Sequence, residues 1–229
     1  MKNIFAAALI FLLSASCAFA GEYPDLGYCI GNNVRLRESP STSSNILGNV
    51  NESSLLVLLD DKIINGKRWY KVEHPTKKGT AWIFGDYIES STSYDKDKAS
   101  YENLVKIISG WGVTAEKART IFGRPKKSQK RKFFFDPANR NFTEEILEYS
   151  NFKLSYIEGR LSHIETTSEK FSFGEINIGD TTAEVLEILG EPDGKGKEGW
   201  SYEATPRDII LFEFRNGKVA YMTFDHYID

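Results

Sequence analysis

The chain has 229 residues, of which 41% are hydrophobic and 27% charged, proportions that exclude a wholly disordered or collagen-like protein. This length is enough for one large or two small domains with their own cores. The net charge of −3 argues against a general nucleic-acid-binding protein, because a phosphate-binding surface normally gives a basic excess. We therefore expect no nucleic-acid partner.

The N-terminus has the order of a secretory signal: Lys2, then an apolar run over 4–13, then small residues over 14–20. The apolar run is too short to span a bilayer. Cleavage after Ala20 predicts a signal peptide over 1–20 and an exported protein, periplasmic or secreted. The alternative is a lipid anchor on Cys17, which Ser14 disfavours because lipoprotein signals usually have leucine at that place.

Loss of the signal leaves Cys29 without a disulfide partner in its own chain. Its apolar neighbours favour a small buried side chain in a strand. The alternative is a nucleophile, which needs a base to hold the thiolate. The histidines that could serve are His74, His163 and His226.

Residues 28–90 contain short apolar or alternating runs separated by polar turns, which is typical of a small all-β barrel. The segment 33–44 (NVRLRESPSTSS), the segment 69–72 (WYKV) and the segment 79–88 (GTAWIFGDYI) resemble, in this order, the opening, middle and closing strands of the bacterial SH3 family. We predict such a domain over 21–91. The resemblance implies a non-catalytic module that binds cell-wall peptides or an adjoining domain.

Aromatic residues of this domain are candidates for a binding groove, because flat rings supply contact area at small entropic cost. Strand alternation directs about half of them into the core. The candidates are Trp69, Tyr70, Trp82, Phe84 and Tyr87.

A polar, charged stretch follows, and Tyr101, Leu104, Val105 and Ile108 then recur at helical spacing. We assign 92–110 to a linker and an amphipathic helix that ends near Gly110.

The remaining chain contains an internal repeat with an offset of 67 residues. Each copy predicts a helix with a threonine cap, an apolar stripe and a glycine–proline stop, followed by antiparallel strands. Glu184 completes a capping box with Thr181, whereas Lys117 cannot do so for Thr114. The matching residues are Gly112, Thr114, Ala118, Ile121, Phe122, Gly123 and Pro125, which recur as Gly179, Thr181, Val185, Ile188, Leu189, Gly190 and Pro192.

The predicted fold class is therefore α+β: an N-terminal all-β SH3-like barrel, then two helix-plus-antiparallel-sheet repeats over 111–168 and 169–229. In these repeats Ile121 and Ile188 are expected in the core. The Gly-x-Pro stop and the closing segment 212–219 (FEFRNGKV) resemble BamE/SmpA-type outer-membrane assembly lipoproteins and, in tandem, the β-lactamase inhibitor protein. The resemblance implies a protein-binding surface in the envelope and no enzyme activity.

Two further sets of residues are candidates for contact with a partner. At least two of four aromatic residues are expected to lie together, partly exposed, on the free sheet face or at the seam between the repeats: Trp111, Tyr149, Trp200 and Tyr202. A basic segment is most simply a solvated loop leading into a strand. Its alternative is an anion-docking patch, giving peripheral membrane contact or an acidic partner, formed by Lys126, Lys127, Lys130, Arg131 and Lys132.

The sequence has no closely spaced metal-ligating motif, no phosphate-binding loop and no nucleophile elbow. We expect no cofactor and no metal. The preferred function is a non-catalytic binding protein of the bacterial cell envelope that engages an envelope protein or a peptidoglycan peptide. The alternative is a cell-wall hydrolase that uses Cys29 with a histidine.

Overall fold

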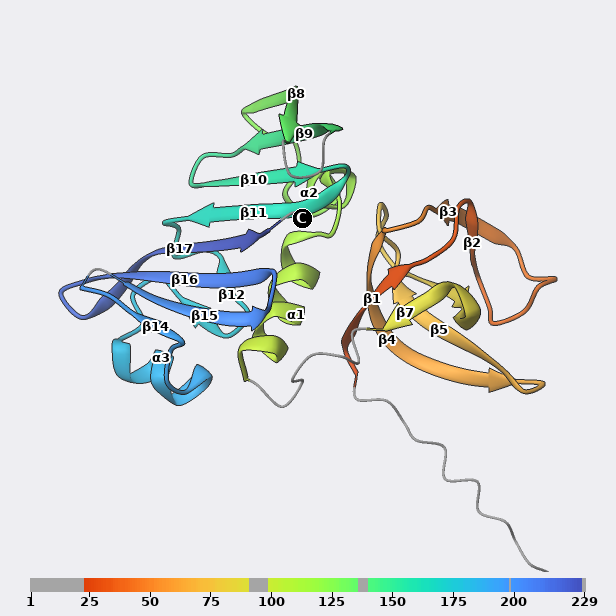
Figure 1. Cartoon of the computed structure of the whole chain (residues 1–229), viewed down its shortest axis with the longest axis horizontal. Coiled ribbons are helices and arrows are strands. Elements are labelled where there is room, and N and C mark those ends of the chain that lie inside the picture. Colours follow the sequence, from red (N-terminus) through yellow and green to blue (C-terminus); the bar gives the residue numbers. More distant parts are fainter. Residues whose placement is uncertain (1–22, 91–98, 136–139, 198, 228–229) are drawn as a thin grey trace, which may run out of the picture.

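The computed structural model describes residues 23–90, 99–135, 140–197 and 199–227. The expected signal peptide, Cys17 and most of the linker lie outside these ranges. The described residues form two parts, an N-terminal β domain and a larger part with three helices (Figure 1). Across the described ranges, none of the helices is long and apolar enough to cross a membrane.

The N-terminal domain is one antiparallel sheet with the strand order β3-β2-β6-β5-β4-β1-β7. Its core contains the fully buried side chains of Leu36, Leu58, Val72 and Ile83. The long β4–β5 hairpin turns at Asn65 and Gly66, whose φ angles of 52° and 75° suit these two residue types. The elements are β1 (Asp25–Cys29), β2 (Val34–Arg37), β3 (Ile46–Val50), β4 (Leu55–Ile64), β5 (Lys67–Glu73), β6 (Thr80–Phe84), the 3-10 helix η1 (Gly85–Tyr87) and β7 (Ile88–Ser90).

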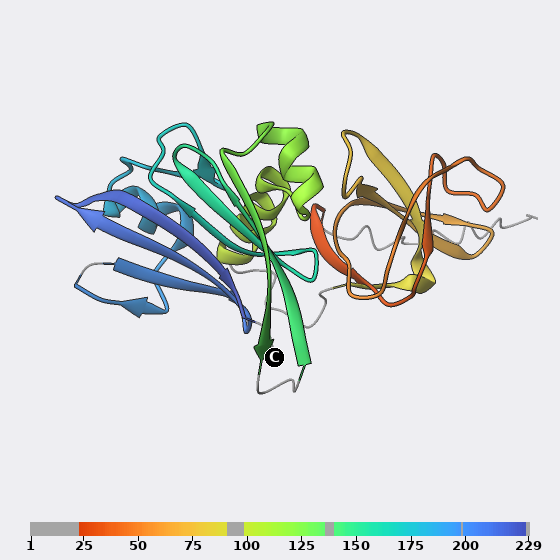
Figure 2. The same ribbon diagram turned by 90° about the horizontal axis from the view of Figure 1, so that it is seen from above.

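The larger part is an eight-stranded antiparallel sheet with three helices packed on one face, while the other face is open (Figures 1 and 2). The strand order is β14-β15-β16-β17-β11-β10-β9-β8. The helices are α1 (Ala99–Trp111), α2 (Ala115–Phe122) and α3 (Thr182–Leu189). The sheet strands are β8 (Lys127–Phe135), β9 (Arg140–Glu148), β10 (Phe152–Ile157), β11 (Arg160–Thr166), β14 (Gly194–Lys195), β15 (Gly199–Thr205), β16 (Asp208–Arg215) and β17 (Lys218–His226), and a separate two-stranded ribbon is formed by β12 (Ser172–Phe173) and β13 (Ile176–Asn177).

Helix α1 confirms the predicted amphipathic helix. Its buried side chains face the sheet, and Tyr101 at its start donates a hydrogen bond of 2.7 Å to Asp25 on β1. Trp111 at its end lies among four phenylalanine rings at centroid distances of 5.1–5.7 Å: Phe122, Phe152, Phe171 and Phe173. The Trp111 indole N–H donates to the carbonyl of Ser172 at 2.9 Å. This helix therefore holds the two parts of the chain together and fills the main core.

The predicted starts and ends of α2 and α3 are confirmed. Thr114 and Thr181 each accept a hydrogen bond from the amide three residues later, and only the α3 cap is a capping box. Both helices end at a glycine, Gly123 or Gly190, with φ near 75–78°.

The expected core position of Ile121 is wrong. Its side chain is 41% exposed, whereas Ala118 and Val185 are fully buried. Ala118 and Phe122 face the core, and Ile121 lies in the last turn of α2 on the side turned to solvent. Ile188, at the matching place in α3, is half-buried against the core.

Candidate ligand groove between the two domains

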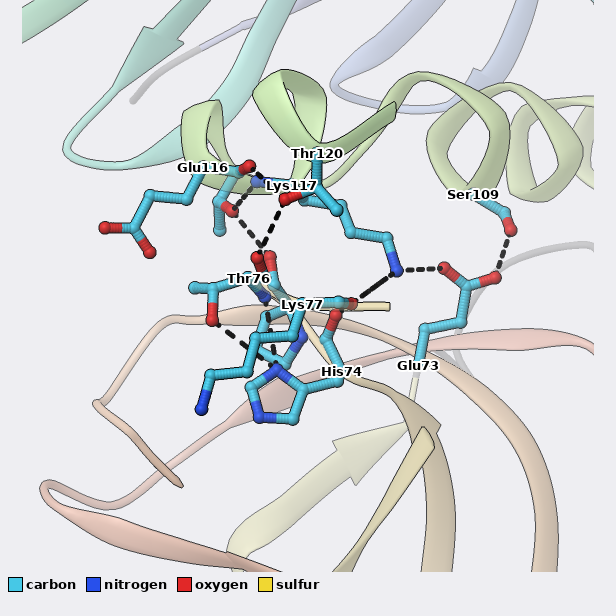
Figure 3. Close-up of polar contacts among 10 residues, drawn as sticks. Glu73, His74, Thr76, Lys77, Ser109, Glu116, Lys117 and Thr120 are labelled. Atoms are coloured by element: carbon cyan, nitrogen blue, oxygen red, sulfur yellow. Dashed lines mark hydrogen bonds and ion pairs between the residues drawn. The ribbon is translucent and has the colours of Figure 1, made fainter. Parts of the chain in front are cut away.

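The loop between β5 and β6 fixes the N-terminal domain to helix α2 through Lys117 (Figure 3). The Lys117 ammonium donates to the carbonyls of His74 and Lys77 at 3.3 and 3.1 Å, and it lies 3.6 Å from the carboxylate of Glu73. The side chain is 10% exposed. Burying an ammonium costs free energy unless it is hydrogen-bonded, and here two carbonyls and the Glu73 carboxylate offset that cost.

Threonine hydroxyls add two more contacts between the same loop and α2. Thr114 Oγ1 donates to the carbonyl of Pro75 at 2.5 Å, and Thr120 Oγ1 lies 3.3 Å from the carbonyl of Thr76, with the carbonyl of Glu116 in its own helix at 3.0 Å. The loop's backbone oxygens are thus paired with side chains of the other domain. These contacts join the two domains at this loop.

A cavity of about 430 Å³ lies beside this junction. One wall is the β3–β4 turn over residues 49–55 together with Pro75 and Thr76. The other wall comes from Val113 and Thr114 before α2, the β10–β11 turn over 157–160, and His226 at the end of β17. Both domains therefore contribute residues to one cavity.

A second cavity of about 400 Å³ continues from the first onto the open face of the sheet. The two share the lining residues Ile157, Ser162 and His226. The second is lined in addition by Arg131, Phe133, Glu144, His163, Asp225 and Tyr227. We refer to the two adjoining cavities as the interdomain groove.

Two histidines of the groove are held by carboxylates. His163 Nδ1 is 2.7 Å from Asp225 and its Nε2 is 3.3 Å from Glu165. Burial lowers the pKa of His163, but the hydrogen bonds and charges of these two carboxylates outweigh burial, so the pKa is raised. His226 Nδ1 lies 2.8 Å from Asp208, which also accepts a hydrogen bond of 2.5 Å from Thr205.

The predicted aromatic groove of the N-terminal domain is mostly closed. Tyr70 packs into the domain core. Trp69 and Trp82 point to the opposite side of the sheet, yet they are only 4% and 9% exposed. Lysine ammonium groups lie over the rings of this outer side, Lys62 over Trp82 and Lys67 over Phe84, each at 5.3 Å from the centroid.

Phe84 is half-buried between the Trp69 and Tyr87 rings, and Tyr87 is exposed. Of the five predicted groove aromatics, then, Tyr87 alone is exposed to solvent. The sequence pattern does not reveal this because the covering lysines come from the neighbouring hairpin.

The second predicted aromatic patch is absent. Trp111, Trp200 and Tyr202 are 2%, 8% and 1% exposed. Alternation along β15 directs both of its aromatic rings toward the helices, where they join the main core. Tyr149 is half-buried, stacked on Phe152 at 4.4 Å, so no exposed cluster forms.

The predicted anion-docking segment is not a free basic loop. From Lys127 onward it forms the edge strand β8, and three of its cations pair with carboxylates on β9. These pairs are Lys127 with Glu148, Lys130 with Glu145, and Arg131 with Glu144. Lys126 and Lys132 are exposed. The charge of this segment is therefore largely compensated within the sheet.

Cys29 is 1% exposed, and its thiol donates to the carbonyl of Gly31 at 3.2 Å. Burial raises its pKa, which keeps the thiol protonated and weakly nucleophilic. The structure thus favours the buried hydrophobic interpretation of this residue over the nucleophile.

Sequence reasoning missed most of the residues that line the groove. Lys117, which contacts the loop beside the groove, carried a signal, because it stands where a capping box would have glutamate. Arg160 carried none, since it approaches the β3–β4 turn only through the fold. His163 and His226 are candidates from the sequence only as bases for Cys29, which does not line the groove.

Comparison with known families supports the first part of this description. Residues 32–89 match the family model of the bacterial SH3 domain, as predicted for the N-terminal domain. No curated protein matches the chain.

Two solved structures are similar to parts of the chain. One is an extracellular protein containing an SCP domain from Bacillus anthracis, with 8% identity and a TM-score of 0.38 over 52% of this chain and 45% of that chain. The other is a DUF4309 family protein from Bacillus subtilis, with 13% identity and a TM-score of 0.33 over 58% of this chain and all of that chain. The chain thus spans about half the length of the first structure.

Proposed function

We propose that the protein is an exported, non-catalytic binding protein of the bacterial cell envelope that holds a peptidoglycan peptide in the interdomain groove. The observation that carries this proposal is that one groove has walls from both domains, and Lys117 joins the two domains beside it. The bacterial SH3 match at 32–89 supports an extracellular, cell-wall role, because the family resemblance implies cell-wall peptides as ligands.

The chemistry of the groove suits a short polar peptide. Its first cavity is within the size range of small-molecule sites. The wall from the SH3 domain supplies amide and hydroxyl groups of Asn49, Asn51, Ser53 and Ser54, and the wall from the sheet supplies charged groups. A peptide with carboxylates and amines has partners for both kinds of wall.

We also propose that the two halves of the eight-stranded sheet are copies of one unit, as in a BamE-like tandem. Support comes from the matched caps and glycine stops of α2 and α3. It also comes from the strand order. β11 and β17 pair at the centre of the sheet, and from each of them the strands follow outward in reverse chain order: β10, β9 and β8 on one side, β16, β15 and β14 on the other. In this proposal the first copy has taken on the contact with the SH3 domain.

The absence of catalysis is part of the proposal. It is supported by the buried Cys29 thiol, and the described residues contain no cluster of three or more metal-ligating side chains. The partners of the His226 and His163 rings are carboxylates, and within the described ranges no serine, threonine or cysteine side chain is hydrogen-bonded to either ring.

The test is co-sedimentation of the chain from residue 21 with purified peptidoglycan. Asn49→Trp places a large ring at an exposed position of the groove wall, and we expect it to reduce binding at least fivefold. Asn151→Trp is the matched control, because this exposed residue lies at the opposite end of β10. Failure of the wild-type chain to sediment, or equal loss in both variants, would contradict the proposal.

A further inference from the structure

Arg160 occupies a distinctive place in the interdomain groove. It is the first residue of β11 and follows the tight turn at Glu158 and Gly159, whose φ angles are 50° and 82°. Its side chain is half-buried and lines both the 430 Å³ cavity and a small adjoining cavity that also touches Asp208 and His226. The guanidinium is thus located where the two domains face each other.

The carboxylates around Arg160 are already engaged. Glu158 accepts a hydrogen bond from the amide of Thr143, and Asp208 accepts from His226 and Thr205. Glu52, on the SH3 side, accepts from the Asn32 side chain at 3.4 Å. None of them forms an ion pair with Arg160.

The Arg160 side chain makes no hydrogen bond or ion pair with any residue in the described ranges, whereas its backbone pairs with Ile157 across the β10–β11 hairpin. A guanidinium has five N–H donors and keeps its charge at any physiological pH. Half burial removes part of its hydration, so an unpaired guanidinium here favours an anion that enters the cavity. Asn51 adds a second donor, because its Oδ1 accepts from the amide of Asn33 and its NH₂ group is left for another acceptor.

We propose that Arg160 binds a carboxylate of the ligand, so that the groove selects peptides with a free acidic group. This inference rests on the proposed function and names the chemical class that the groove recognises. The planar guanidinium matches a carboxylate with two parallel hydrogen bonds. The polar side chains of the β3–β4 turn would then contact the peptide next to that carboxylate.

The experiment uses soluble fragments released from peptidoglycan by a muramidase, either native or with their carboxyl groups converted to methylamides. Binding to the chain from residue 21 is measured by titration calorimetry. We expect the native fragments to bind at least tenfold more tightly than the amidated ones. Arg160→Gln should weaken the binding of native fragments to the level of the amidated ones. Arg160→Lys should restore part of the difference in affinity between the two.

Arg124→Gln is the matched control, because this exposed arginine follows α2 and does not line the groove. Circular dichroism establishes that each variant is folded. If native fragments bind Arg160→Gln as tightly as wild type, or bind no better than amidated ones, the role of Arg160 is wrong and the proposed function stands. If wild type binds neither fragments nor intact peptidoglycan, the proposed function is wrong and this inference falls with it.

Discussion

Helices α2 and α3 begin with the same threonine cap and end with the same kind of glycine, yet they use their third residue differently. In α3 the side chain of Glu184 returns to the amide and hydroxyl of Thr181 and closes a capping box within the helix. In α2 the side chain of Lys117 points away from its own cap and binds the backbone of the SH3 domain. One helix end is self-contained and the other is an interdomain contact.

The third residue of α2 is thus used for contact with another domain, and the third residue of α3 for its own cap. Thr114 still accepts the amide of Lys117, so the loss of the capping box leaves the start of α2 intact. The hydroxyl of Thr114 donates its proton to the carbonyl of Pro75 in the SH3 domain. Local helix stability and domain contact therefore use different atoms of the same two residues.

The largest expected effect comes from breaking the α2 contact. Lys117→Met keeps the apolar stem but leaves two carbonyls and Glu73 without their ammonium partner, and should lower the free energy of unfolding by about 2–4 kcal/mol. Denaturant melts followed by tryptophan fluorescence measure it. Glu184→Gln, in the solvent-exposed α3 cap, should lower the melting temperature much less; an equal loss in the two variants would contradict the comparison.

A smaller effect is expected where the two helices present their matching isoleucines. Ile188→Ala should cost about 1–2 kcal/mol, since this side chain is half-buried, and Ile121→Ala less than about 0.5 kcal/mol, since it is 41% exposed. Both values come from urea melts of the single variants. A larger loss for Ile121→Ala would mean that α2 packs more deeply than α3.

The smallest effect concerns pH at the seam where β11 and β17 join the two halves of the sheet. Because the pKa of His163 is raised above 6.5, its stabilising contact with Asp225 and Glu165 is fully present below that pH and is lost as pH rises through the folded-state pKa. The contribution of His163 to the free energy of unfolding should therefore decrease as the pH is raised from 5 to 8. Asp225→Asn should flatten this dependence of stability on pH. An unchanged dependence in that variant would assign it to another group.

Features set by neighbouring residues could be predicted from the sequence, and features set by distant strands could not. The caps of Thr114 and Thr181, the end of α1 and the strands around Trp69 follow from spacing and turn residues. Which side of α2 faces the SH3 domain depends on the fold, and the apolar spacing alone predicts a core position for Ile121, which is 41% exposed.

The residues of the candidate site could not be predicted from the sequence for the same reason. The groove brings together residues near positions 51, 160 and 226, which no local pattern connects. The carboxylate partners of the basic residues on β8 lie on β9, so the basic run alone does not predict that its charges are paired. The Lys62 ammonium of the adjacent hairpin lies over the Trp82 ring, a contact that alternation alone does not indicate.

The edge strand β8 also bears on self-assembly. A nine-residue strand with one unpaired side is a template for a strand from a second molecule. On β8, Lys127 and Lys130 are paired with carboxylates of β9, but Lys132 is exposed and in no ion pair with the described residues, and lysines on an edge strand disfavour pairing with a second strand. At the other end of the sheet β14 has only two residues, too few to recruit a partner strand. Both ends thus oppose growth of the sheet into a fibre, and this opposition weakens as salt screens the lysines.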